Sequence, residues 1–163
     1  MSLREFVPED VNALAAILSD PETMQYYPVS FDHAAVVDWI ARNRARYVND
    51  GYGLWAMILN STGELIGDCG LVRQTVDGTD EVEIGYHVRG DQWGQGYATE
   101  AARACRDYGF ANLKVDKLIS LIRPENIASC RVAEKNGMTI WKEVTRVNLL
   151  HYVYAIRRNQ ISE

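Results

Sequence analysis

The stretch VEIGYHVRGDQWGQGYAT, residues 82–99, decides the fold because it joins a strand pattern to a helix pattern across a glycine-containing loop. Its first seven residues alternate in character, with the period of a β-strand that buries one face. The apolar set is Val82, Ile84, Tyr86 and Val88, and the other set is Glu83, Gly85 and His87. After the glycines, small and apolar residues recur at helical spacing and predict a helix over 97–111. With a further strand predicted at 117–122, the order indicates a right-handed parallel strand–helix–strand unit.

The rest of the chain divides into short segments of the same two kinds. Further helices are predicted from Pro8 to about 19, from a Ser30 cap to about Asp50, and over 127–136. Further strands are predicted at 3–6, 54–59, 64–74, 139–146 and 150–157, with turn signals that include Asn60-Ser61-Thr62-Gly63 and Asp77-Gly78. This order predicts an α/β fold, a mixed sheet with helices on both faces, in one domain that spans residues 1–163.

The composition is that of a folded globular domain. Hydrophobic residues make up 47% and charged residues 24% of the 163 positions, so disordered, collagen-like and coiled-coil chains are excluded. The net charge of −5, without a Lys/Arg cluster, argues against nucleic acid as the main partner. We expect no membrane partner, because no apolar stretch approaches the ~20 residues of a membrane span. We expect no secretory signal, because residues 1–5 have neither an apolar core nor a cleavage site. Three cysteines without paired spacing predict reduced thiols in a cytoplasmic protein, and the scattered histidines predict no metal site.

The glycine loop is the first candidate binding site. It precedes a predicted helix, whose first N–H groups lack partners and carry the positive end of the helix dipole. Gly94 and Gly96 remove two Cβ atoms, so an anion such as phosphate can approach these amides. An ordinary glycine turn without a ligand is the alternative interpretation. The Walker pattern fails because no Lys follows the glycines, and the dinucleotide pattern fails at Thr99.

A different pattern fits. Glu83-Ile84-Gly85-Tyr86, followed by residues 93–101, resembles the acetyl-CoA site of the GNAT N-acetyltransferase superfamily. Within it the chain is similar to the branch of ribosomal-protein N-terminal acetyltransferases and their relatives. Residues 20–28, 124–129 and 134–138 resemble the same branch in the same order along the chain. The superfamily motif begins with Gln or Arg where this chain has Trp93.

The resemblance implies which residues hold acetyl-CoA. The strand that matches 82–88 separates from its neighbour, so its last residues offer backbone groups to the amide-rich pantetheine arm. The implied cofactor-binding residues are Tyr86, His87, Val88, Trp93, Gly94, Gln95, Gly96, Tyr97, Ala98, Thr99 and Asn126. Arg89, Arg131 and Lys135 are candidates to screen phosphate charge, or ordinary surface cations.

The implied reaction is direct attack of a primary amine on the acetyl thioester. By resemblance, Ser129 is the general acid, although it could merely cap its helix. Glu83 is the first candidate for the base, and His87 the second, although His87 is expected to contribute mainly its backbone. A backbone N–H near His87 or Val88 would stabilise the oxyanion. Tyr26 and Tyr27 are the predicted substrate lid. Trp39, Trp55 and Trp141 are further possible walls, with core packing favoured for Trp39 and Trp55.

The sequence does not determine which amine accepts the acetyl group. An α-amine with a pKa near 8 is neutral far more often at pH 7 than a lysine side chain, a difference of about 3.5 kcal/mol. This favours a peptide N-terminus as the acceptor. The alternatives are an enzyme that acetylates a small amine (a polyamine, an amino acid or an aminoglycoside), a non-catalytic acyl-CoA-binding module, or an interaction scaffold. The resemblance also allows a homodimer.

Overall fold

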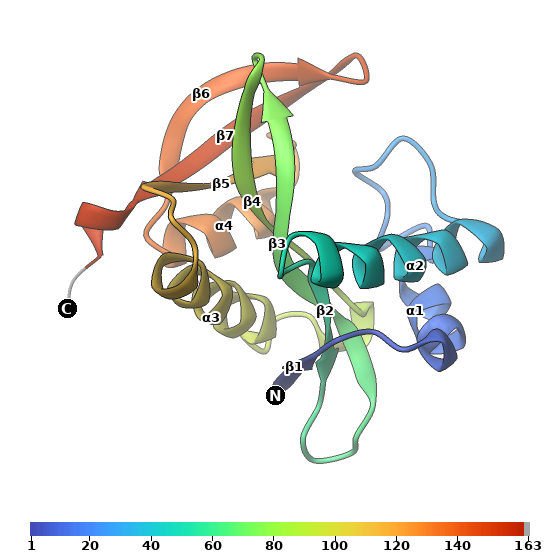
Figure 1. Ribbon diagram of the computed structural model, residues 1–163. Coiled ribbons are helices and arrows are strands. Elements are labelled where there is room, and N and C mark those ends of the chain that lie inside the picture. The colour runs from blue at the N-terminus through green and yellow to red at the C-terminus, as the bar shows by residue number, and fades with distance from the viewer. Residues whose placement is uncertain (162–163) are drawn as a thin grey trace.

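The computed structural model describes residues 1–161 and contains one seven-stranded sheet in the order β1-β2-β3-β4-β5-β7-β6 (Figure 1). The strands are β1 (Ser2–Arg4), β2 (Leu54–Ile58), β3 (Leu65–Val76), β4 (Thr79–Val88), β5 (Lys117–Ile122), β6 (Thr139–Arg146) and β7 (Leu149–Arg157). The helices are α1 (Val11–Leu18), α2 (His33–Asn49), α3 (Tyr97–Asn112) and α4 (Ile127–Lys135). All pairings are antiparallel except that of β4 with β5, which is parallel. The predicted mixed α/β sheet is confirmed.

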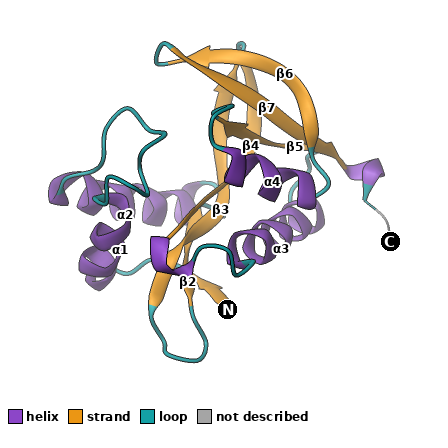
Figure 2. Cartoon of the chain, turned by 180° about the vertical axis from the view of Figure 1, so that it is seen from behind, coloured by secondary structure: helices purple, strands orange, loops and turns teal. Residues whose placement is uncertain are grey.

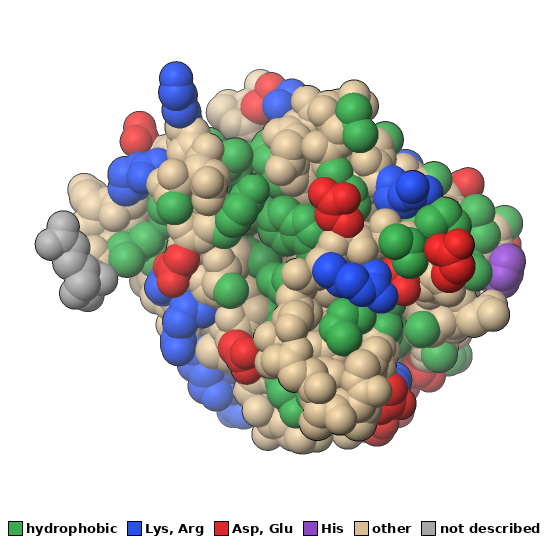
Figure 3. All heavy atoms as spheres, turned by 60° about the horizontal axis from the view of Figure 1, so that its bottom comes forward, with side chains coloured by type: hydrophobic (Ala, Val, Ile, Leu, Met, Phe, Trp, Pro, Cys, Tyr) green, Lys and Arg blue, Asp and Glu red, His purple; other side chains and the backbone are tan. Residues whose placement is uncertain are grey.

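Helices cover both faces of the sheet, as predicted (Figure 2). The α1 and α2 helices bury Leu14, Ile17 and Val36 against β2 and β3. On the opposite face, α3 and α4 bury small side chains such as Ala101 and Ala133, which let the helices approach the sheet closely. Charged side chains of both signs surround a central hydrophobic area on the face shown in Figure 3. Within residues 1–161, no helix is long and apolar enough to cross a membrane.

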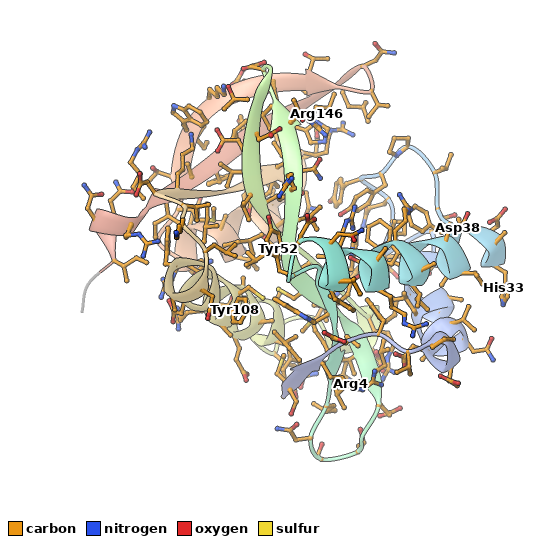
Figure 4. The ribbon with its side chains drawn as sticks, in the orientation of Figure 1. Arg4, His33, Asp38, Tyr52, Tyr108 and Arg146 are labelled. Carbon is orange, nitrogen blue, oxygen red and sulfur yellow. The ribbon has the colours of Figure 1, made fainter. Side chains whose placement is uncertain are left out.

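The β3–β4 hairpin is the longest element of the sheet. Its two-residue turn has positive φ at Asp77 (50°) and Gly78 (75°), the geometry that matches the twist of a tight hairpin. The turn fixes the register from Val76 opposite Thr79 down to Gly67 opposite Val88. From the far end of the sheet, Arg146 donates to the Thr75 carbonyl at 2.9 Å, so β6 curls over the hairpin tip (Figure 4).

Strands β4 and β5 separate after a short contact. One parallel bridge, Glu83 opposite Ile119, joins them within residues 1–161. The Ser120 hydroxyl then donates to the Ile84 carbonyl at 2.8 Å, and the Leu121 amide donates to the Glu83 carboxylate at 3.0 Å. Side chains thus replace the backbone ladder, and the last residues of β4 have a free edge.

Two predicted boundaries are corrected. The N-cap of α2 is Asp32, whose carboxylate accepts the Ala35 amide at 2.8 Å, and not Ser30. Both residue types cap helices, and a carboxylate at this position also complements the helix dipole. The first strand ends at Arg4 rather than at residue 6, because Phe6 turns into the core between α1 and α2.

Candidate functional site

One cavity of about 430 Å³ lies where β4 ends, beside the N-termini of α3 and α4 and the loop between α1 and α2. Its lining contains most of the residues predicted from sequence. Those present are Tyr26, Tyr27, Tyr86, His87, Val88, Trp93, Gly94, Gly96, Tyr97, Ala98, Thr99, Asn126 and Ser129. Gln95 and Glu83 do not line it; Gln95 is exposed and donates to Gln92 at 3.3 Å. The chain therefore brings segments from across the sequence to one hollow.

The glycine loop presents open amides to this cavity. Gly96 is the N-cap of α3 with φ 86°, and Gly94 has φ 75°. A Cβ at either glycine would meet nothing within 4 Å, so the space that a side chain would fill is open. The first N–H groups of α3 have no partner within the helix, and Gly96 has no side chain to cap them. The loop therefore leaves open space beside the uncapped N-terminus of α3.

Cations support the same interpretation. Arg131 and Lys135, from α4, line the cavity beside the glycine loop. Arg89 is placed differently, because its guanidinium pairs with Asp91 at 2.6 Å and with Glu64 at 3.7 Å and does not line the cavity. Of the three cations considered from sequence, two are therefore available to screen phosphate charge.

The end of β4 offers backbone groups on one edge only. Arg89 donates its amide to Ile66 at 2.7 Å, and in the same register His87 pairs with Asp68. Because antiparallel pairing alternates along a strand, the backbone groups of His87 face β3, and those of Tyr86 and Val88 face the free edge. Of the three residues expected to offer backbone groups to the pantetheine arm, Tyr86 and Val88 thus remain candidates, whereas the backbone of His87 is paired to β3. The Val88 carbonyl already accepts a hydrogen bond at 2.7 Å from the indole N–H of Trp93, a residue that is 44% exposed.

The N-terminus of α4 forms the opposite wall. Asn126 caps this helix through its side-chain oxygen, which accepts the Ser129 amide at 3.2 Å. Its amide nitrogen remains to donate into the cavity. The Ser129 carbonyl accepts the Tyr86 hydroxyl at 2.9 Å, which ties α4 to the end of β4. Burial raises the pKa of that phenol, so Tyr86 stays protonated and acts here as a hydrogen-bond donor.

Glu83 lies behind the cavity, between three strands. One carboxylate oxygen accepts the Leu121 amide at 3.0 Å, and the other accepts the Gln74 side chain at 3.1 Å. Burial raises the pKa of this carboxyl, against these two hydrogen bonds, which lower it. The expected base therefore also serves as a brace at the point where β4 leaves β5.

The structure adds Asp68 to the site. Its side chain is fully buried, and one carboxylate oxygen lies 2.8 Å from Nδ1 of His87. The other oxygen accepts the indole N–H of Trp39 at 3.0 Å. The sequence carried a signal for this pair: counting inward from an Asp77-Gly78 turn places residue 68 opposite residue 87. A lone carboxylate within the apolar run of β3 is a second such signal.

The predicted lid lies over this pair. The Tyr27 ring packs at a tilt of 41° against the His87 imidazole, with a centroid separation of 5.1 Å, although 44% of the residue is exposed. Burial and the negative charges of Glu83 and Asp68 raise the pKa of the Tyr27 phenol. The Tyr26 carbonyl is held by Arg123 at 3.4 Å, which attaches the loop to the end of β5. Within residues 1–161, no group of three or more His, Cys, Asp or Glu side chains could hold a metal ion.

A family model, related sequences and related structures all indicate the same family of proteins. The family described as "Acetyltransferase (GNAT) domain" matches residues 1–139. The uncharacterized protein YkkB of Bacillus subtilis is 41% identical over 138 residues, which are 85% of this chain and 80% of that protein. The uncharacterized N-acetyltransferase p20 of Bacillus licheniformis is 30% identical over 88% of this chain and 80% of its own length. The crystal structure of a GNAT-family acetyltransferase from Bacillus anthracis superposes with a TM-score of 0.81 at 29% identity, covering 96% of this chain and 94% of that one.

Proposed function

The chain belongs to the GNAT family and is an acetyl-CoA-dependent acetyltransferase, and we propose that its acceptor is the α-amine at a peptide N-terminus. The observation that carries this proposal is the single cavity that runs from the glycine loop to the Tyr26–Tyr27 loop. It offers an anion site at one end and aromatic walls at the other. An acyl carrier and an amine can therefore meet inside it without a covalent enzyme intermediate.

The carrier would be held by groups of three kinds. The open amides of residues 94–99, with Arg131 and Lys135 nearby, suit a diphosphate. The free backbone edge of Tyr86 and Val88 suits the amides of the pantetheine arm, which can pair as a short added strand. The side-chain amide of Asn126 is a further donor from the opposite wall. These residues fit the thioester carrier that the family uses.

The same arrangement serves acyl transfer. The Val88 amide faces the free edge, where a thioester carbonyl paired to β4 would develop negative charge. Preorganised donors of this kind contribute about 2.7–4 kcal/mol to transition-state stabilisation. Ser129 lies on the opposite wall and is the proposed donor to the leaving thiolate, directly or through water. Transfer then needs only a group that removes a proton from the incoming amine.

The charge of the cavity favours a singly charged acceptor. Among the lining residues that the structure describes, Glu22 is the only carboxylate, whereas polycations such as polyamines need several. An α-amine also needs about 3.5 kcal/mol less than a lysine amine to become neutral at pH 7. The first argument supports a peptide N-terminus over a polyamine or an aminoglycoside, and the second supports it over a lysine side chain.

A matched acceptor panel tests the proposal. Purified protein and acetyl-CoA are incubated with an Ala-initiated peptide that contains one internal Lys, with the same peptide formylated at its α-amine, with spermidine and with an aminoglycoside. Mass spectrometry should show one acetyl group on the free peptide and none on the formylated one. Acetylation of the formylated peptide or of the polycations would contradict the proposed acceptor. A thermal shift with acetyl-CoA but no acetylated product would indicate a carrier-binding module.

A further inference from the structure

The pair of His87 and Asp68 is a deeply buried ionisable pair beside the cavity. The His87 side chain is 8% exposed and that of Asp68 is 0% exposed, and 2.8 Å separates Nδ1 from the carboxylate. Trp39 donates to the second carboxylate oxygen at 3.0 Å, which fixes the orientation of the carboxylate. Neither residue is needed to hold the carrier, and the pair lies on the strand face turned toward α2 and the lid.

We infer that Nε2 of His87 removes the proton from the acceptor amine, and that Asp68 is the positioning residue that orients the imidazole. This inference rests on the proposed function and names the proton acceptor in the same site. It transfers to His87 the role that sequence patterns favoured for Glu83.

The unpartnered nitrogen is the main argument. An ionised carboxylate only accepts hydrogen bonds, so Asp68 places the proton of the neutral imidazole on Nδ1. The lone pair is therefore on Nε2, which is buried and has no hydrogen-bond partner among residues 1–161. A buried unsatisfied group costs on the order of 1–3 kcal/mol, and such groups are rare in native structures. An amine hydrogen would satisfy this nitrogen.

Two aromatic rings pack beside the His87 imidazole, and they differ in how firmly they are held. The imidazole lies between the Tyr27 ring, at 5.1 Å, and the Trp39 ring, at 6.0 Å. Trp39 is fixed by its bond to Asp68, whereas Tyr27 belongs to the connection between α1 and α2 and is partly exposed. His87 and Tyr27 both line the cavity. Rotation of the Tyr27 side chain would open Nε2 to the space in which the amine arrives.

Glu83 is less suited to the task. Both of its carboxylate oxygens already accept hydrogen bonds, from Leu121 and Gln74, and it does not line the cavity. Moving the Glu83 carboxylate would break these two hydrogen bonds, which link β4 to β3 and β5. Its negative charge instead assists His87 from four residues away on the same strand, because it favours the imidazolium.

The proton balance is complete without another reactant. An acceptor ammonium group has three N–H protons, of which the amide product keeps one. One proton passes to Nε2 before attack, the C–N bond forms, and the C–S bond breaks. The second proton leaves nitrogen as the tetrahedral intermediate collapses and ends on the thiolate sulfur, and His87 returns its proton to solvent.

The surroundings of His87 define its pH response. Burial lowers the pKa of the imidazole, but the charge and hydrogen bond of Asp68 from β3, with the charge of Glu83 from β4, raise it by more. The lid contributes the neutral phenol of Tyr27, and α2 contributes the uncharged Trp39 with Arg42 stacked 5.5 Å from its ring centroid. Arg46 of α2 adds positive charge near Glu83. The acid limb of kcat should therefore lie above pH 6.5.

His87→Asn tests the inference with little risk to the fold. The asparagine amide can replace Nδ1–H as the donor to Asp68, but it removes the basic nitrogen. With acetyl-CoA and a free Ala-initiated peptide, kcat should fall by about 10²- to 10⁴-fold. The acid limb should disappear, while CoA affinity and melting temperature stay near wild type. His33→Asn, an exposed histidine on α2, is the matched control and should keep wild-type kcat (Figure 4).

Asp68→Asn tests the positioning role separately. Without the carboxylate, burial becomes the main influence on the pKa of the imidazole and lowers it. The acid limb should therefore move to lower pH, and kcat should fall less than in His87→Asn. Asp38→Asn, on the exposed side of α2, should leave the limb unchanged (Figure 4). If Asp68→Asn does not fold, His87→Asn alone decides.

Two failures can be told apart. If wild-type protein acetylates no amine, the proposed function fails and this inference fails with it. If wild type is active, and folded His87→Asn keeps its acid limb and more than a third of kcat, the proposed function stands and the base lies elsewhere. A limb that disappears in His87→Asn and moves in Asp68→Asn supports the inference, because a merely structural role would move neither.

Discussion

Gly96→Asp should strongly weaken carrier binding at little cost to folding. Gly96 caps α3 with φ 86°, and a Cβ there meets no atom within 4 Å. The new side chain therefore causes no clash in the free protein. It does place a carboxylate in the open space beside the amides that are proposed to hold the diphosphate. The change thus separates binding from stability.

The magnitudes follow from charge and backbone geometry. Two like charges about 4 Å apart repel by ~1 kcal/mol in water and by more near a protein surface. The new carboxylate would repel the two charges of a diphosphate by a total of roughly 2–4 kcal/mol. This loss of binding free energy corresponds to a loss of about 30- to 1,000-fold in affinity. A side chain in the left-handed region costs about 1 kcal/mol, or ~2–4 °C in melting temperature for a chain of this length.

The assay is isothermal titration with CoA, accompanied by thermal unfolding. Gly96→Asn adds nearly the same volume without charge and should lose much less affinity than the aspartate. Gly63→Asp is the matched control, since Gly63 has φ 76°, open space around its Cβ, and a place in the β2–β3 turn. It should lower the melting temperature equally and leave CoA affinity unchanged. Affinity within threefold of wild type for folded Gly96→Asp would refute the placement of the diphosphate.

Three further outcomes are expected from the same structure. Gly70→Ala should destabilise the protein by about 3 kcal/mol or more in urea unfolding, because its Cβ would collide with the Gly53 carbonyl, whereas Gly63→Ala should cost only about 1 kcal/mol. The three buried cysteines should react with a thiol reagent in denaturant but not in the native protein, because they are inaccessible and burial raises the pKa of one of them. The raised pKa of His87 stabilises the fold fully below about pH 6.5 and loses this effect as pH rises through the folded-state value, so wild type should lose stability relative to Asp68→Asn over that interval.

Much of this arrangement could be predicted because the decisive signals are local. Alternation over residues 82–88, two glycines and the helical spacing after them predicted β4, the loop and α3. Glycine reports a backbone requirement directly, and both loop glycines do have positive φ. The order of predicted strands and helices also led to the prediction of a mixed sheet with helices on both faces.

The interactions between distant segments were harder to predict. That Glu83 accepts the Leu121 amide depends on where a parallel strand, separated by a whole helix, stops pairing. No periodicity in either segment encodes that point. The partnership of Trp39 with Asp68 likewise requires α2 to pack over β3 with one face turned inward. By contrast, the pairing of Asp68 with His87 could be counted from the hairpin turn, since a two-residue turn fixes the register.

The geometry of β4 explains why the proposed oxyanion donor and the proposed base are adjacent residues. In a strand, the residues whose side chains point to one face all direct their backbone groups to one edge, and the alternate set uses the other face and edge. Ile84, Tyr86 and Val88 turn their side chains toward α3 and α4, and their amides toward the gap beside β5. His87 belongs to the other set, so its amide is committed to β3 while its imidazole faces the acceptor side. One residue of this strand therefore cannot supply both a backbone amide to the thioester at the free edge and a side-chain base to the amine on the α2 side of the sheet. Adjacent positions such as 87 and 88 are therefore the closest pair on β4 that can provide both groups. The hairpin register places Asp68 of β3 opposite His87.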